Sequence, residues 1–264
     1  MRHNVTMGLT SRHSLLKGLL ATLPHGQPFG LPELASKGVS AHLAAKYVRS
    51  GWLERLAQGI YAFPNDHLQR DACLRCLQNQ VEGFHVGGKT ALDFLGLRHN
   101  VSSRPLLHLW GTQRYTLPSW FTSRYPAKYY HRNLFDTKKL RAMLGDEGYA
   151  FLPGDEFGPA PRISSRERAI LEVLDEVGVS QDLEEATNLF ESFTSMRPQI
   201  IGALLSSCTR IKTIRLFFQL AEKTKVVNIE YLLENYDVPL GGNARWTRRL
   251  QDGSLLSLSP LKKS

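Results

Sequence analysis

Residues 40–63, SAHLAAKYVRSGWLERLAQGIYAF, decide the fold of the N-terminal part of the chain. Their first half predicts a helix, because Ser40 is a favourable N-cap, apolar side chains recur at helical spacing and Gly51 ends the pattern. Their second half consists of two short apolar-rich runs around Ala57-Gln58-Gly59. That pattern predicts a β-hairpin with glycine in the turn.

Two further helices are predicted upstream of this stretch. Leucines recur at helical spacing after Ser11, a suitable N-cap, and predict a helix over residues 11–22. Residues 32–37 predict a shorter helix, with proline in its first turn and Gly38 at its end. Three helices and then a hairpin follow the order of a winged helix-turn-helix. In that fold the third helix enters the major groove of DNA, and the hairpin tip reaches phosphate or the minor groove.

The polar face of the third helix carries the candidate DNA contacts. Small and basic side chains lie opposite its apolar stripe, and such side chains suit a major groove, where acidic ones would meet phosphate. Ser40 is expected to donate to a phosphate as well as to cap the helix. The competing interpretation is an ordinary solvated helix face. The candidate DNA-binding residues of the helix and the hairpin are Ser40, His42, Ala45, Lys46, Arg49, Arg55, Gln58 and Tyr61.

Positive charge is concentrated at the N-terminal end of the chain. The formal net charge of the 264 residues is +9. Residues 1–63 contain seven lysines and arginines against two acidic residues, whereas residues 164–264 contain thirteen of each kind. A basic N-terminal domain attached to a neutral body is typical of a protein that binds the phosphate backbone of nucleic acid.

Composition and motif searches argue against several other classes of protein. Hydrophobic residues make up 42% of the chain, enough for one large core or two domains. The sequence shows neither a signal-peptide pattern nor an apolar run of about 18 residues, so we expect a soluble cytoplasmic protein that is nucleoid-associated when bound to DNA. Three cysteines form no disulfide framework, and Cys73-x-x-Cys76 lacks the further ligands of a zinc site. We expect no metal and no cofactor.

The stretch GFHVGGKT at residues 83–90 fits the letters of a nucleotide-binding P-loop. A working P-loop follows a buried strand and has small residues between its glycines. Here a helical pattern precedes Gly83, and Phe84, His85 and Val86 are bulky. We therefore interpret the stretch as a short strand, a glycine turn and a helix start near Thr90. Nucleotide binding remains the less favoured alternative.

The rest of the chain reads as a mixed region followed by a mainly helical one. Residues 105–110 and 128–134 predict strands, and residues 152–161 predict a loop. A capping box at Ser164-x-x-Glu167 predicts a helix, and further helices are expected over residues 183–196, 198–208 and 213–221. Asp136-x-Lys138 is the only acid-x-Lys triplet and does not suffice for a nuclease, so we predict a non-enzymatic protein. A second basic surface, or equally a solvated face, is predicted at Arg197, Arg210, Lys212 and Arg215.

Four landmarks resemble the AbiEi antitoxins of type IV toxin–antitoxin (abortive infection, phage defence) systems. They occur in the order of that family and span most of the chain: ERLAQGIYAFP at residues 54–64, VGGKTALDFLGL at 86–97, SRERAILEVL at 165–174 and IKTIRLFFQLA at 211–221. The first ten residues and the tail at 255–264 lie outside the resemblance, and no further element is expected in that tail. The resemblance places Arg215 at a recurrent basic position.

The resemblance implies a transcriptional regulator whose N-terminal winged helix binds inverted repeats in its own promoter and represses the operon. It further implies DNA contacts by His42, Lys46, Arg49, Arg55 and Gln58, and a C-terminal region that neutralises a separately encoded nucleotidyltransferase toxin. We predict an α+β fold with a winged helix-turn-helix at residues 1–63. We further predict an antitoxin domain at residues 64–264, which is first mixed α/β and then mainly helical, with a possible break at 153–163.

The expected partners are double-stranded DNA and the cognate toxin, without a membrane, for a monomer or a dimer assembled on DNA. The alternative is a protein-interaction module without operator specificity.

Overall fold

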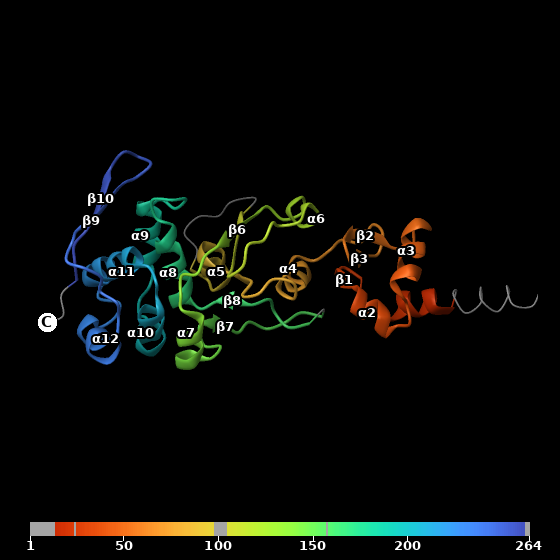
Figure 1. Ribbon diagram of the computed structural model, residues 1–264, viewed down its shortest axis with the longest axis horizontal. Coiled ribbons are helices and arrows are strands. Elements are labelled where there is room, and N and C mark those ends of the chain that lie inside the picture. Colours follow the sequence, from red (N-terminus) through yellow and green to blue (C-terminus); the bar gives the residue numbers. More distant parts are fainter. Residues whose placement is uncertain (1–13, 24, 98–104, 157, 262–264) are drawn as a thin grey trace, which may run out of the picture. The chain divides into compact units, whose positions relative to one another are not determined.

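The computed structural model describes residues 14–23, 25–97, 105–156 and 158–261 (Figure 1). The chain forms two compact units with a mixed α+β composition. The N-terminal unit comprises Met1–Gln80, Leu117–Tyr125 and Leu152–Pro161, and the C-terminal unit comprises Val81–Thr116, Pro126–Phe151 and Arg162–Ser264. The predicted N-cap Ser11 lies outside the described residues.

The described part of the N-terminal unit begins with helical residues 14–22 and continues into a small sheet with four further helices. The sheet is antiparallel in the order β1-β3-β2, so the predicted hairpin β2–β3 is confirmed and gains a third strand that the sequence did not predict. The elements are β1 (Phe29–Gly30), α2 (Leu31–Ser36), α3 (Ala41–Arg49), β2 (Glu54–Ala57), β3 (Ile60–Ala62), α4 (Arg70–Gln78) and α6 (Ser119–Thr122).

One hydrophobic core holds the first part of this unit together. Leu19 and Leu34 are 0% exposed and pack in the same cluster as Phe29, Ala44 and Phe63. Each comes from a different element, so the helices, the sheet and the chain that leaves it share one apolar interior. Burial of side chains of this size contributes roughly 1.5–3 kcal/mol each. The core therefore fixes which face of α3 remains in solvent.

The C-terminal unit is built on a five-stranded mixed sheet in the order β6-β5-β4-β8-β7. The pairs β5·β6 and β4·β8 are parallel, and the pairs β4·β5 and β7·β8 are antiparallel. A two-stranded hairpin, β9–β10, stands apart from this sheet. The strands are β4 (His85–Val86), β5 (Leu107–Gly111), β6 (Ala127–His131), β7 (Tyr149–Ala150), β8 (Ile163–Ser164), β9 (Trp246–Arg249) and β10 (Leu255–Leu258).

Helices surround α8, the central helix of this unit, which contacts α5, α9, α10 and α11 (Figure 1). Every residue of α8 after Arg166 is buried, including five charged ones. Buried charges require partners, and much of the polar structure of the unit serves this helix. The helices are α5 (Gly88–Phe94), α7 (Thr137–Leu144), α8 (Arg166–Glu176), α9 (Leu183–Glu191), α10 (Pro198–Ser207), α11 (Ile211–Thr224) and α12 (Ile229–Asn235).

Three sequence-based predictions need correction. The N-cap of α8 is Ser165, whose side chain accepts from the Arg168 amide, whereas Ser164 donates to Glu172. The helix expected over residues 183–196 ends at Glu191. The tail contains β10, which pairs with β9, so the element missing from the sequence prediction is a strand. Its alternating pattern is too short to reveal a partner that lies in β9.

Within the described ranges, none of the helices combines the length and the apolarity that crossing a lipid bilayer requires.

Candidate nucleic-acid interface

Helix α3 is oriented by the side chains that it buries. Ala44 is 0% and Tyr47 is 7% exposed, and both lie in the N-terminal core. At about 100° per residue, the opposite face must point outward. His42, Ala45 and Arg49 are accordingly exposed, and Lys46 is half-buried. The structure thus brings four of the predicted contact residues together on one outward face.

The two ends of α3 are defined by the residues predicted for them. The Ser40 hydroxyl oxygen accepts a hydrogen bond from the Leu43 amide at 3.3 Å, so the N-cap is confirmed. Gly51 follows the last turn with a φ of +77°, a conformation that glycine adopts without steric cost. The only charged side chains in α3 are basic and lie in its last turn. They complement the negative end of the helix dipole and leave the face without an acidic group.

The hairpin β2–β3 supplies the second part of the candidate interface. Its register shifts between Arg55 and Ala57, and Gly59 closes the turn with a φ of +74°. Gln58, beside Gly59, is exposed, and so is Arg55, whose Nε lies 3.4 Å from the Ala57 carbonyl oxygen. The hairpin therefore presents Arg55 and Gln58 to solvent, together with the acidic side chain of Glu54.

Tyr61 does not belong to this interface, contrary to the sequence prediction. It is 5% exposed and lies in the N-terminal core. It belongs to β3, the middle strand of the three, and all three residues of that strand are buried. The sequence missed this because β1, the strand that covers the far edge of β3, is only two residues long.

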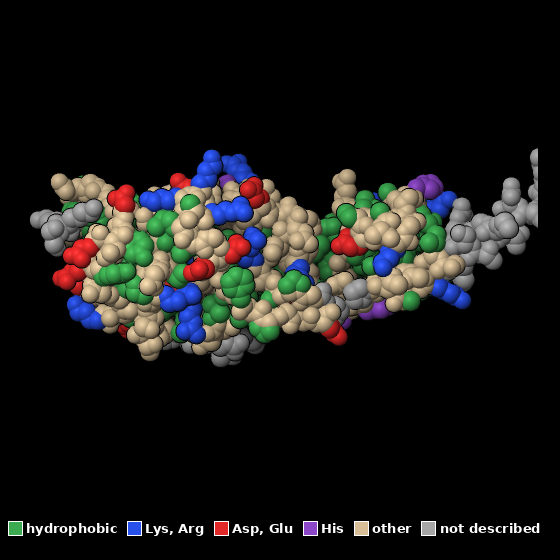
Figure 2. Space-filling model, turned by 90° about the horizontal axis from the view of Figure 1, so that it is seen from below, with side chains coloured by type: hydrophobic (Ala, Val, Ile, Leu, Met, Phe, Trp, Pro, Cys, Tyr) green, Lys and Arg blue, Asp and Glu red, His purple; other side chains and the backbone are tan. Residues whose placement is uncertain are grey.

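Four of the candidate contact residues are not occupied by intramolecular pairing. Among the described residues, the side chains of His42, Lys46, Arg49 and Gln58 make no hydrogen bond and no ion pair. Glu33, one of the two acidic residues of the first 63, turns back to accept from the Gly30 amide at 2.8 Å. On the face drawn in Figure 2, a histidine lies beside lysine or arginine side chains on the N-terminal unit.

The second basic surface predicted in the C-terminal unit does not form. Arg197 pairs with Glu167, with nitrogen–oxygen distances of 2.9 and 2.7 Å. Arg215 is 4% exposed and donates to the carbonyl oxygens of Ala244 and Gly242. Lys212 donates to the carbonyl oxygens of Asp175 and Val177. These three cations hold loops and helix ends. Arg197 and Arg210 are exposed, but Arg197 is paired with Glu167.

The glycine loop is occupied by a carboxylate of the chain itself. Glu172 accepts from the Gly88 amide at 2.8 Å, at the N-terminus of α5, where a P-loop would hold phosphate. The same carboxylate accepts from Arg168 Nε at 2.9 Å and from the Ser164 hydroxyl, and it lies 2.9 Å from His85 Nε2. Lys89 points elsewhere and pairs with Glu185 at 3.0 Å. Because Glu172 occupies the position of a phosphate, the glycine loop has a structural role.

Family models cover nearly the whole chain. Residues 12–103 match a model described as transcriptional regulator, AbiEi antitoxin N-terminal domain. Residues 104–258 match a model described as transcriptional regulator, AbiEi antitoxin, Type IV TA system. No curated protein matches the chain.

A solved structure has a similar fold. The crystal structure of the RV2827C protein from Mycobacterium tuberculosis has a TM-score of 0.52 to this chain at 15% sequence identity, with 89% of this chain and 88% of that chain covered. At this identity the likeness concerns the fold alone.

The two family matches together run from residue 12 to residue 258 and include the helix, hairpin and glycine-turn landmarks described above. The chain belongs to the AbiEi antitoxin family, the transcriptional regulators of type IV toxin–antitoxin systems.

Proposed function

We propose that this protein represses its own operon and counteracts a nucleotidyltransferase toxin encoded beside it. In this proposal residues 1–63 form a winged helix-turn-helix that binds inverted repeats in the promoter, and residues 64–264 form the antitoxin domain, with a possible break at 153–163. The observation that carries the DNA-binding part is the outward face of α3, which bears His42, Lys46 and Arg49 without an acidic side chain.

The dimensions of this face suit a duplex. Helix α3 has nine residues, about 13.5 Å at a rise of 1.5 Å per residue, and the major groove is about 12 Å wide. Arg49 and Lys46 are the candidates for guanine edges or phosphates, and the small Ala45 lets the helix approach. The Ser40 oxygen accepts within the cap, which leaves its hydroxyl hydrogen free to donate to a phosphate.

The hairpin is proposed to act as the wing. Arg55 and Gln58 reach phosphate or the minor groove beside the groove that α3 enters. A single unit of this kind reads one half-site, so inverted repeats require two copies, either dimeric in solution or assembled on the DNA.

An electrophoretic mobility-shift assay on the DNA upstream of the gene tests the proposal. We expect salt-sensitive retardation, because displaced counterions drive phosphate contacts. Combined Lys46→Ala and Arg49→Ala substitutions should weaken binding at least about tenfold and flatten the dependence of log Kd on log salt, since each lost phosphate contact removes about one unit of slope.

The matched control removes the same charge elsewhere. Lys138 and Arg141 are exposed on α7, and their combined change to alanine should leave the affinity within about twofold. Absence of retardation, or equal losses in both double variants, would refute specific DNA reading by α3. Toxin neutralisation that survives deletion of residues 1–63, in a protein that never binds the operator, would support the interaction-module alternative instead.

A further inference from the structure

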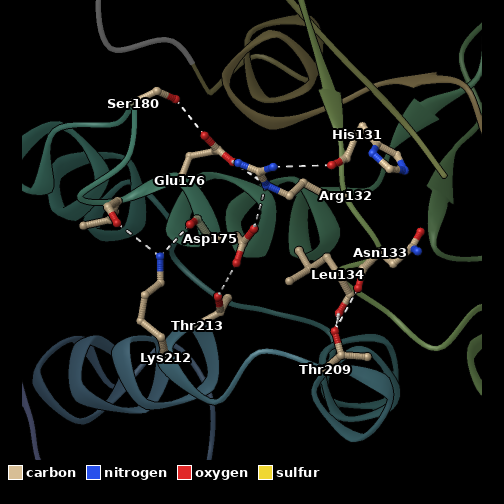
Figure 3. A network of polar contacts seen from close by, with 11 residues as sticks. His131, Arg132, Asn133, Leu134, Asp175, Glu176, Ser180, Thr209, Lys212 and Thr213 are labelled. Carbon is tan, nitrogen blue, oxygen red and sulfur yellow. Dashed lines mark hydrogen bonds and ion pairs between the residues drawn. The ribbon is translucent and has the colours of Figure 1, made fainter. Parts of the chain in front are cut away.

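A cleft of about 460 Å³ lies in the C-terminal unit, whereas the elements assigned to DNA binding belong to the N-terminal unit. Its walls come from the segment after β6, the C-terminal end of α8, the N-terminal end of α11 and strand β9. Figure 3 shows polar contacts of Arg132, Asp175 and Lys212, three of the residues that line it. We call it the cationic cleft, and its lining residues are Arg132, Asp175, Val179, Thr209, Arg210, Ile211, Lys212, Trp246 and Arg248.

One part of the cleft is fixed by internal pairing. Arg132 donates to Glu176 at 3.1 Å, and Asp175 accepts from the Thr213 hydroxyl at 3.0 Å (Figure 3). Lys212 donates to the carbonyl oxygens of Asp175 and Val177, at 2.5 and 3.1 Å, and so caps the end of α8. These contacts position Arg132, Asp175 and Lys212 and leave them little freedom to rearrange.

The two remaining cations have no such partners. Arg210 and Arg248 are exposed, and among the described residues their side chains make no hydrogen bond or ion pair. Both act on Lys212, whose pKa is lowered by burial in the first place and further by Arg248 and Arg210, against the opposing effect of Asp175 and Glu176. Asp175 is the only acidic residue in the lining. The cleft thus has an uncompensated positive charge.

The remaining lining is apolar. Ile211 and Trp246 are half-buried, and Val179 is 41% exposed. Inorganic phosphate would satisfy the arginines but leave this surface in water. A DNA backbone offers only the C–H groups of its sugars, each flanked by charged phosphates, and no side chain long enough to fill the apolar part of the cleft. An acidic peptide segment with an aliphatic side chain matches both parts, because its carboxylates meet the arginines while the side chain covers the apolar lining.

We propose that the cationic cleft binds an acidic segment of a protein partner, with Arg210 and Arg248 as the carboxylate-binding residues and with Ile211, Val179 and Trp246 receiving an aliphatic side chain. This binding site is separate from α3 and the hairpin, and it does not depend on repression of the operon. It gives the C-terminal unit a point of direct protein contact.

Fluorescence anisotropy of the full chain with a labelled peptide of alternating Glu, Asp and Leu tests the site. We expect saturable binding at low salt. The affinity for the peptide should fall at least about tenfold when Arg210→Ala and Arg248→Ala are combined. The matched control combines Arg245→Ala and Arg249→Ala, which removes the same charge from exposed positions next to Arg248 that do not line the cleft. That control should bind within about twofold of the original chain. A second peptide with Ser in place of Leu should bind at least about fivefold more weakly.

Three results would overturn the site: no saturation, equal losses in the two double variants, or equal affinity for the Leu and Ser peptides. A short duplex of unrelated sequence serves as competitor. If the Arg210 and Arg248 changes weaken binding of the duplex more than binding of the peptide, the cleft contacts nucleic acid and the proposal is wrong. Should the alanine variants fail to fold, the measurement is repeated with Arg210→Gln and Arg248→Gln combined. If the cleft variants still retard the operator DNA, the cleft and the DNA-binding site are independent.

Discussion

At the residue scale, the carboxylate of Glu172 accounts for the glycine loop. It is buried, with 1% of its side chain exposed, and burial opposes its charge. His85, Arg168 and the Gly88 amide outweigh that cost and hold the pKa of Glu172 below its usual range. An ionised carboxylate thus closes the N-terminus of α5 from inside the protein. The P-loop-like sequence is therefore explained by this internal contact, which involves a residue distant in the sequence.

Replacing Glu172 with glutamine should destabilise the protein by about 3–5 kcal/mol, because Arg168 would remain buried without its counter-charge. Urea unfolding at neutral pH, followed by circular dichroism, measures the effect. Glu184→Gln on the exposed part of α9 is the control and should change the free energy of unfolding by less than about 0.5 kcal/mol. A loss of the same small size at Glu172 would contradict the role assigned to it.

Gly87 makes a second residue-scale prediction. A Cβ at this position would lie 2.3 Å from Glu172 Oε2 and 2.5 Å from Trp110 Cδ1, closer than non-bonded atoms approach. Gly87→Ala should therefore lower the free energy of unfolding by at least about 2 kcal/mol through overpacking. Gly242→Ala, where nothing lies within 4 Å of the added Cβ, should be nearly neutral. Equal melting temperatures for the two variants would show that the β4–α5 turn adapts without cost.

At the scale of elements, the sequence pattern predicts the buried face of α3 correctly but does not predict the burial of α8. The apolar stripe of α3 predicts its buried face, because that helix has one side in the core and one in water. Helix α8 has the capping and stripe of an ordinary amphipathic helix, yet its polar side is buried too. Its charged residues pair with groups from α10, α11 and the segment after β6, and the local sequence pattern does not predict those partners. Tertiary contacts likewise occupy Lys212, which donates to carbonyl oxygens at the end of α8, and Arg215, which donates to those of Ala244 and Gly242.

The cap of α3 can be tested separately from DNA binding. Ser40→Ala removes the acceptor for the Leu43 amide and should destabilise the N-terminal unit by about 1 kcal/mol, whereas Ser40→Gly should cost only a few tenths. Thermal unfolding in the absence of DNA measures both variants. If glycine proved as costly as alanine, the hydroxyl would contribute through something other than helix capping.

At the scale of the whole molecule, the described residues form two compact units whose division does not follow the sequence order. Segments 117–125 and 152–161 belong to the N-terminal unit although they come from the middle of the chain. Arg75 connects α4 to the second of these segments, through Asp155 at 3.0 Å and the Pro159 carbonyl oxygen at 2.8 Å. A loop rich in proline and glycine could be predicted from composition, but its attachment to α4 could not.

Acid should destabilise the C-terminal unit through His108. Burial, together with Lys89 and Lys128, lowers the pKa of His108 from 6.5 to about 4. The folded protein therefore keeps this ring neutral where the unfolded chain protonates it, so stability is fully present above pH 6.5 and is lost as the pH falls toward 4. Urea unfolding across this range should show a shallower pH dependence in His108→Gln, and the exposed His67→Gln variant should match the original chain. A parallel shift of all three curves would contradict this assignment.

The sequence by itself determined the elements whose signals are local. Ser40, Gly51 and the apolar stripe between them define α3, and Gly59 defines the hairpin turn within the first family landmark at residues 54–64. Only the tertiary structure decided which side chains remain available for a partner. Tyr61 is buried in a strand whose edge is covered by β1, a strand of only two residues. Glu172 binds the amide of the glycine loop although it lies more than 80 residues away in the sequence. Periodicity depends on neighbours within a few residues, whereas burial and charge pairing depend on segments that only folding brings together.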